Sequence, residues 1–139
     1  MLSIEGNKLK SIPSTVKYAH SLTEFNVNTN EISNIPDDLC SLSKLRSLNL
    51  GHNKLKHIPA AIGELTSLQK LQVDHNSITE IPESIQSLTQ LEVFHLDSNR
   101  FTKIPVSIGS LSALNELALD WLVYSRSPKP RVVTKTQHF

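Results

Sequence analysis

A 23-residue period runs through most of this chain and restricts its possible folds more than any other feature. Two residue types keep this period over five copies, each advancing in steps of 23. The positions are Asn7, Asn30, Asn53, Asn76 and Asn99, and Pro13, Pro36, Pro59, Pro82 and Pro105. A fixed period of this length indicates an architecture of stacked structural repeats.

Apolar residues keep the same period between these anchors. The clearest copy begins at Leu45 and reads Leu-x-x-Leu-x-Leu-x-x-Asn-x-Leu-x-x-Ile-Pro-x-x-Ile-x-x-Leu, ending at Leu65. Its Leu-x-Leu alternation is typical of a half-buried strand, and the apolar spacing after the proline is helical. Proline disfavours helix in the residue before it, so each Ile-Pro pair marks the start of the outer side of a repeat.

This pattern resembles the leucine-rich repeat family, in the 23-residue intracellular form that carries an Ile-Pro pair. Gly63 and Gly109 stand where that form often has glycine, and the resemblance covers roughly residues 1–120. It is similar to the Ras-group and Ras-scaffold repeat proteins. The resemblance implies an α/β fold, a right-handed solenoid with a curved parallel sheet on its concave side and short helical or irregular convex segments.

The periodic asparagines follow the expected strands, where the chain turns into the body of the repeat. A side-chain amide offers two donors and two acceptors. It can therefore pair turn backbone groups of its own repeat and of the next, which would otherwise be buried without partners. The family resemblance implies a structural ladder formed by Asn7, Asn30, Asn53, Asn76 and Asn99.

The repeats account for residues 1–124, as five full or near-full copies and a partial sixth. Residues 120–124 either cap the last repeat or form an aromatic docking surface around Trp121. Residues 125–139 carry four basic side chains and no acidic one, and we expect a flexible tail. At the other end no polar cap precedes Leu2 and Ile4, which predicts either a fragment of a longer solenoid or self-association through this end.

The composition argues against several classes of protein. The net charge of +1 gives no global attraction to nucleic acid or membranes. The chain shows no signal-peptide pattern and no apolar run near the ~20 residues of a membrane helix. Cys40 is the only cysteine, so no intrachain disulfide can form. We expect a cytoplasmic protein that neither binds nucleic acid nor inserts into membranes.

Catalytic patterns are also missing from the sequence. Cys40 occupies the repeat position of Gly63 and Gly109, and no histidine or lysine lies at a spacing that implies its activation. With four glycines in the chain, no glycine-rich phosphate loop is present. We therefore expect no enzymatic activity and no cofactor.

Residues that alternate with the buried leucines should point outward from the concave face. The candidate protein-binding residues are Glu24, Asn26, Asn28, Ser47, Asn49, His52, Lys70, Gln72, Asp74, His75, His95, Asp97, Glu116 and Asp120. Asp74, Asp97 and Asp120 recur at one repeat position. They predict either an acidic row that recognises a basic segment of a partner or ordinary solvated charge.

His52 and His75 should also be neighbours, with His95 nearby. Imidazoles suit zinc or copper. Two surface histidines without a third fixed ligand make a poor site, however. The sequence therefore favours ordinary surface histidines and no metal.

The function that follows is a non-catalytic module for protein–protein interaction, an intracellular adaptor or scaffold that binds its partner on the concave face. The alternative is the substrate-recognition or regulatory segment of a larger enzyme, such as a kinase or a ubiquitin ligase. A small GTPase-type signalling partner follows only by analogy with the Ras-group proteins.

Overall fold

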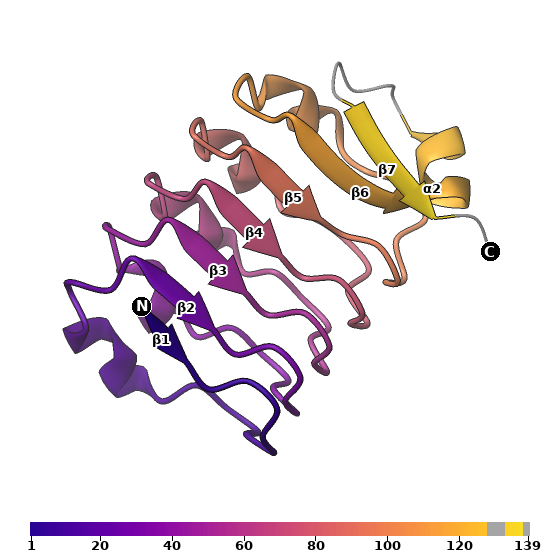
Figure 1. Cartoon of the computed structure of the whole chain (residues 1–139). Helices are drawn as coiled ribbons and strands as arrows, with labels where there is room; N and C mark the ends of the chain where they lie inside the picture. Colours follow the sequence, from indigo (N-terminus) through magenta and orange to yellow (C-terminus); the bar gives the residue numbers. More distant parts are fainter. Residues whose placement is uncertain (128–132, 138–139) are drawn as a thin grey trace.

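Seven short parallel strands, stacked in chain order, form one sheet within the described part of the chain. The computed structural model describes residues 1–127 and 133–137, with the backbone alone at 121–122 and 133–137. The strands are β1 (Leu2–Ser3), β2 (Glu24–Asn26), β3 (Ser47–Asn49), β4 (Lys70–Gln72), β5 (Val93–His95), β6 (Glu116–Asp120) and β7 (Val133–Gln137). Figure 1 shows them side by side, with the two ends of the chain at opposite ends of the sheet.

The strand register repeats the sequence period. Phe25 pairs with Leu48, and Leu48 pairs in turn with Leu71, so each step along this part of the sheet is 23 residues. A strand of three residues cannot bury its apolar side alone, and its stability comes from contact with neighbouring repeats. The open parallel solenoid predicted from the period is confirmed.

Short helical segments form a second layer behind the sheet (Figure 1). They are η1 (Ser14–Tyr18), α1 (Asp37–Cys40), η2 (Ala60–Glu64), η3 (Glu83–Ser87) and η4 (Val106–Ser110), and all but α1 are 3-10 helices. Each begins directly after the periodic proline, whose extended ψ lies between 144° and 155°. The predicted role of the Ile-Pro pair as the start of the outer side is confirmed.

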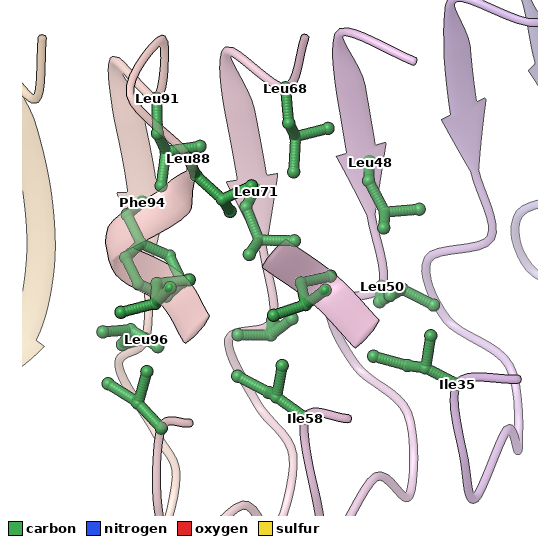
Figure 2. Close-up of a cluster of buried hydrophobic side chains, with 14 of the residues drawn as sticks. Ile35, Leu48, Leu50, Ile58, Leu68, Leu71, Leu88, Leu91, Phe94 and Leu96 are labelled. Carbon is green, nitrogen blue, oxygen red and sulfur yellow. The ribbon is translucent and has the colours of Figure 1, made fainter. Parts of the chain in front are cut away.

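The core lies between these two layers. Strand residues such as Leu48, Leu71 and Phe94 are fully buried, and so are outer-layer residues such as Ile62 and Leu88. Figure 2 shows the side chains of Leu48, Leu71, Leu88 and Phe94 in the space between the sheet and the helical segments of successive repeats. Because every repeat supplies the same apolar positions, one continuous core runs through the stack.

Four of the five predicted asparagines form a hydrogen-bonded ladder along the edge where the strands end, whereas the fifth, Asn7, donates to Ile4 O and Glu5 O of its own repeat. Asn53 Nδ2 donates to Leu50 O and Gly51 O in its own repeat, at 3.1 Å each, and to Val27 O of the preceding repeat at 3.0 Å. Asn53 Oδ1 accepts from Ile32 N at 3.0 Å. The ladder therefore joins each repeat to the preceding one, whereas we expected it to reach the next. Asn30, Asn76 and Asn99 make the equivalent bonds.

The residue before each ladder asparagine adopts a left-handed backbone conformation. Its φ lies between 50° and 70° in five successive repeats, at Gly6, Thr29, His52, His75 and Ser98. Non-glycine residues adopt this conformation rarely. The chain thus turns sharply at the same point in each of these repeats. This turn sets the direction of the side chain of the left-handed residue.

The C-terminal end departs from the sequence expectations. Residues 121–126 form helix α2 (Trp121–Arg126), in which Val123 is buried. Ser127 Oγ accepts from Ile104 N at 2.9 Å, which holds the end of α2 on the preceding repeat. The segment after Asp120 therefore packs against the preceding repeat, and its role as a cap, one of the two sequence interpretations, stays a prediction. The Trp121 side chain, on which the docking alternative depends, lies outside the described residues.

The flexible tail predicted for residues 125–139 is wrong where the structure describes it. Strand β7 pairs in parallel with the whole of β6, from Glu116↔Val133 to Asp120↔Gln137. The outer edge of β6 has backbone groups that need a partner strand. The β-branched residues Val133, Thr134 and Thr136 favour a strand at this edge. Residues 128–132 and 138–139 lie outside the described part of the chain.

The N-terminal end of the stack leaves apolar side chains open to solvent. Met1 is 83% exposed and Tyr18 is 70% exposed, and Leu2 is also exposed. Ile4, which the sequence placed at the same end, is partly buried against the core. None of the described helices is both long and apolar enough to cross a membrane.

Candidate functional site

The candidate site is the open face of the sheet, opposite the helical layer. The register places equivalent outward residues side by side, in the rows predicted from the sequence. One row contains Glu24, Ser47, Lys70, Val93 and Glu116, and the other contains Asn26, Asn49, Gln72, His95 and Ala118. Most of these side chains are partly or fully exposed, while the residue between the two rows is buried in each of the strands β2 to β6. The open face is therefore polar and continuous.

A shallow hollow lies on the N-terminal half of this face. It is lined by Met1, Leu2, Glu24, Phe25, Asn26, Ser47, Asn49, Lys70 and Gln72. Six of these residues belong to the predicted binding set, so the fold brings them together across β2, β3 and β4. The hollow offers one acidic group, one basic group and three amides within a small area.

The amides in the hollow are held by local hydrogen bonds. Asn26 Nδ2 donates to Glu5 Oε2 at 2.7 Å, and Asn26 Oδ1 accepts from Asn28 N at 3.1 Å. Asn49 Oδ1 accepts from Gly51 N in the same way, at 3.0 Å. These side chains are thus oriented before any partner arrives, which lowers the entropy cost of binding.

A bridge of three side chains continues the face towards the C-terminus. Gln72 Nε2 lies 3.2 Å from His95 Nδ1, and His95 Nε2 lies 2.8 Å from Glu116 Oε1. If the glutamine amide donates to Nδ1, the imidazole carries its proton on Nε2 and donates it to Glu116. His95 therefore contacts Gln72 and Glu116 and does not belong to the cluster of His52 and His75.

The predicted acidic row does not form a uniform solvated surface. Asp97 is 5% exposed. Burial raises the pKa of its carboxyl group, and the neighbouring Asp74 raises that pKa further. Asp120 lies beside Ser98, whose backbone N–H is 3.1 Å from both of its carboxylate oxygens. Of the three aspartates in this row, only Asp74 is partly exposed without accepting from a backbone N–H among the described residues. The structure therefore does not support recognition of a basic segment by all three carboxylates.

Asp120 replaces a backbone acceptor. In the preceding repeats the left-handed residue donates its N–H to a carbonyl of the next repeat, as His52 N does to Asp74 O and His75 N to Asp97 O. At Ser98 the carboxylate of Asp120 accepts instead, where β6 gives way to α2. Asp120 therefore has a structural role that the sequence period did not reveal.

His52 and His75 lie in direct contact at the end of strands β3 and β4. Their rings stack with centroids 4.0 Å apart and an interplanar angle of 12°. The adjacent Asp74 brings a carboxylate oxygen to 4.0 Å from His52 Nε2. The sequence predicted the histidine pair but missed the aspartate. The signal was available, because Asp74 directly precedes His75 in the period.

Cys40 is a candidate nucleophile by residue type, but the sequence predicts no catalytic role for it. Its side chain is fully buried, and burial raises the pKa of the thiol to about 12. The thiolate, which is the reactive form, is therefore strongly disfavoured at neutral pH.

Comparison with protein families gives one match across most of the chain. The model of a leucine-rich repeat region matches residues 25–138. No curated protein sequence matches the chain.

Solved structures with the same fold belong to longer proteins. The ectodomain of the plant membrane receptor kinase GASSHO1/SCHENGEN3 from Arabidopsis thaliana, in complex with CASPARIAN STRIP INTEGRITY FACTOR 2, is 31% identical with a TM-score of 0.77. That match covers 94% of this chain and 16% of the receptor chain. The plant peptide hormone receptor RGFR1 in complex with RGF2 is 24% identical with a TM-score of 0.69, over 86% of this chain and 24% of that one.

An internalin, InlF, from Listeria monocytogenes is also similar. It is 24% identical with a TM-score of 0.68, over 90% of this chain and 33% of the internalin chain. The present chain thus spans no more than a third of the length of any of these three proteins.

Proposed function

The chain belongs to the leucine-rich repeat family, and from this we propose that it is a non-catalytic module that binds an extended segment of a protein partner across its open face. The observation that carries the proposal is the hollow formed by β2, β3 and β4. It lies on a rigid parallel sheet, and its amides are oriented in advance by hydrogen bonds within the chain.

The chemistry of the hollow fits a peptide that carries charges of both signs. Glu24 and Lys70 are exposed on its floor, two strands apart, and Gln72 adds an amide that can pair with a peptide backbone. Two of the similar structures are complexes, GASSHO1/SCHENGEN3 with CASPARIAN STRIP INTEGRITY FACTOR 2 and RGFR1 with RGF2. These complexes support the proposal by likeness of fold.

A charge exchange tests the proposal without changing the net charge of the protein. Peptides are first selected from a random displayed library with the wild-type chain, and their affinities are measured by fluorescence anisotropy. We expect the double variant Glu24→Lys/Lys70→Glu to bind them at least about 10-fold more weakly, a loss of about 1.4 kcal/mol.

The matched control exchanges Glu80→Lys and Lys103→Glu, two exposed residues outside the hollow. This control should bind the selected peptides as the wild type does. Equal binding by the hollow variant and the wild type, or failure of the wild type to enrich any peptide, would exclude the hollow as the binding site.

The finer role that we propose is that of a cytoplasmic adaptor or scaffold in signal transduction. The free, buried thiol of Cys40 supports a reducing compartment. A small GTPase-type partner rests on the Ras-group resemblance alone. Imaging of the tagged protein in its source cells tests the compartment, and an extracellular location would overturn this role.

A second candidate function is recognition within a larger enzyme. The observation that favours it is the 16% share of the receptor kinase ectodomain that this chain matches. Transcript mapping of the gene tests this candidate. A reading frame that continues into a kinase or ubiquitin-ligase domain would support it, and a frame limited to these repeats would exclude it.

Self-association through the N-terminal end is a further interaction that we propose. Met1, Leu2 and Tyr18 expose apolar surface beside the edge strand β1. Sedimentation equilibrium should show a mass that increases with concentration, and Leu2→Glu/Tyr18→Glu should remain monomeric. A wild-type chain that is monomeric at all concentrations would contradict it.

A further inference from the structure

Two histidines stand at equivalent positions of neighbouring repeats, in the turns that follow β3 and β4. His52 and His75 both have a left-handed backbone, with φ of 51° and 50°. The same position holds glycine, threonine and serine in the other repeats, so the turn itself does not require histidine. The turns lie side by side in Figure 1, which agrees with the ring contact at 4.0 Å between centroids.

The backbone around the pair is fixed by hydrogen bonds. His52 N donates to Asp74 O at 3.0 Å, and His75 N donates to Asp97 O at 3.0 Å. Each turn is therefore tied to the next repeat. This arrangement fixes the spacing of the two turns that carry the imidazoles before any ligand binds, which favours a metal site.

The third group is the carboxylate of Asp74, whose side chain is 18% exposed. It lies over Gly51, where an added Cβ would be 2.9 Å from Asp74 Oδ1 and 3.2 Å from Oδ2. The absence of a side chain at Gly51 thus leaves room for the carboxylate beside His52. One ligand atom each from His52, Asp74 and His75 lies within 4.8 Å of the other two.

We propose that His52, Asp74 and His75 form a binding site for one Zn²⁺ ion. With zinc–ligand bonds of about 2.0–2.1 Å, the ligand atoms of a tetrahedral site lie about 3.3 Å apart. The three groups must therefore approach one another by no more than about 1.5 Å, which rotation of the exposed imidazoles can supply. The fourth position faces solvent and takes a water molecule.

A ligand set of two imidazoles and one carboxylate favours Zn²⁺ over the hard cations Mg²⁺ and Ca²⁺. Mg²⁺ and Ca²⁺ prefer sites made entirely of oxygen ligands, whereas imidazole nitrogen suits zinc. The site is separate from the hollow that we propose for peptides, whose lining contains none of the three residues. The inference therefore does not depend on the proposed function.

Titration of the whole, untagged chain with zinc chloride in an isothermal calorimeter tests the site. We expect one zinc ion per chain and no measurable binding of magnesium. His52→Asn and His75→Asn should each weaken zinc binding at least about 10-fold. Asparagine tolerates the left-handed conformation, so both variants should keep the fold.

His57→Asn is the matched control, because His57 is exposed and lies outside the cluster. It should bind zinc as the wild type does. In a parallel NMR titration, the ring protons of His52 and His75 should shift with zinc while those of His57 should not. No zinc binding by the wild type, or equal binding by the His52 and His75 variants, would overturn the proposal.

Discussion

Asn53 illustrates how a single side chain connects two repeats. Its amide donates to carbonyl groups on both sides of the boundary and accepts from Ile32 N. Asn7 occupies the same repeat position, but it is exposed, and among the described residues its side chain donates to Ile4 O and Glu5 O of its own repeat. Two asparagines that look identical in the sequence should therefore differ in their contribution to stability.

We expect Asn53→Ala to lower the free energy of unfolding by about 1–3 kcal/mol, since backbone groups inside the stack lose their partner. Asn7→Ala should change it by no more than about 0.5 kcal/mol, as for most surface substitutions. Urea denaturation followed by circular dichroism measures both. Equal losses in the two variants would contradict the ladder.

Asp97 is a buried carboxylate beside a second carboxylate, so its charge should destabilise the fold at neutral pH. Because its pKa is raised by burial and then by Asp74, the charged form binds a proton more readily in the folded state than in the unfolded one. We expect Asp97→Asn to increase stability at pH 7. The gain should shrink as the pH falls through the raised pKa and vanish below the ordinary value of 3.8.

Thermal unfolding of the wild type and of Asp97→Asn across this pH range checks the sign. A variant that is less stable than the wild type at pH 7 would show that the carboxylate is stabilised in the fold.

The sequence predicted the core residues and the asparagine ladder because both recur every 23 residues. It did not predict whether each asparagine bonds to the preceding or to the following repeat, because a periodic sequence looks the same in both directions. It also missed the left-handed turn, because Thr29, His52, His75 and Ser98 are not residues whose presence by itself indicates a positive φ. Only Gly6 carried that signal.

At the scale of elements, the packing of η2 against η3 depends on the absence of a side chain at Gly63. An added Cβ at Gly63, in η2, would lie 2.7 Å from the backbone oxygen of Ser84 in η3. At Gly109, in η4, it would meet no atom within 4 Å among the described residues. Neither glycine has a positive φ.

We therefore expect Gly63→Ala to destabilise the protein by about 1–3 kcal/mol through overpacking. Gly109→Ala should be neutral or stabilise it by up to about 1 kcal/mol, because alanine restricts the unfolded chain. Chemical denaturation of the two variants provides the comparison. A Gly63→Ala variant as stable as the wild type would mean that η2 and η3 can separate at little cost.

Strand β6 ends where Asp120 replaces the backbone acceptor of the regular turn. Asp120→Ala should leave Ser98 N without this acceptor and cost about 1.5–3 kcal/mol, the range for hydrogen bonds to charged groups. Native-state hydrogen exchange should show faster exchange at Ser98. Unchanged exchange there would contradict this role for Asp120.

The elements that the sequence predicted are those inside the period, and the elements that it missed lie beyond the period. Helix α2 and strand β7 follow the point where the pattern stops, so no alignment with other repeats was available. The segment Val132-Val133-Thr134-Lys135-Thr136 is rich in β-branched residues. That strand signal was outweighed by the basic charges and the prolines at positions 128 and 130.

At the scale of the whole molecule, the stack places outward residues of distant sequence position in straight rows. Periodicity alone therefore predicted which side chains would line the open face. It did not predict which of them are available to a partner, because availability depends on contacts between repeats, such as the burial of Asp97 and the pairing of His95 with Glu116. Those contacts restrict the candidate site to its N-terminal half.

The most direct test of the central claim is an NMR titration of the ¹⁵N-labelled chain with a peptide selected on the wild type. We predict that the largest amide shifts fall on β2, β3 and β4, at residues such as Asn26, Asn49 and Gln72, while the helical layer stays unchanged. Shifts centred on η2 and η3 would place the binding surface on the opposite side and contradict the claim.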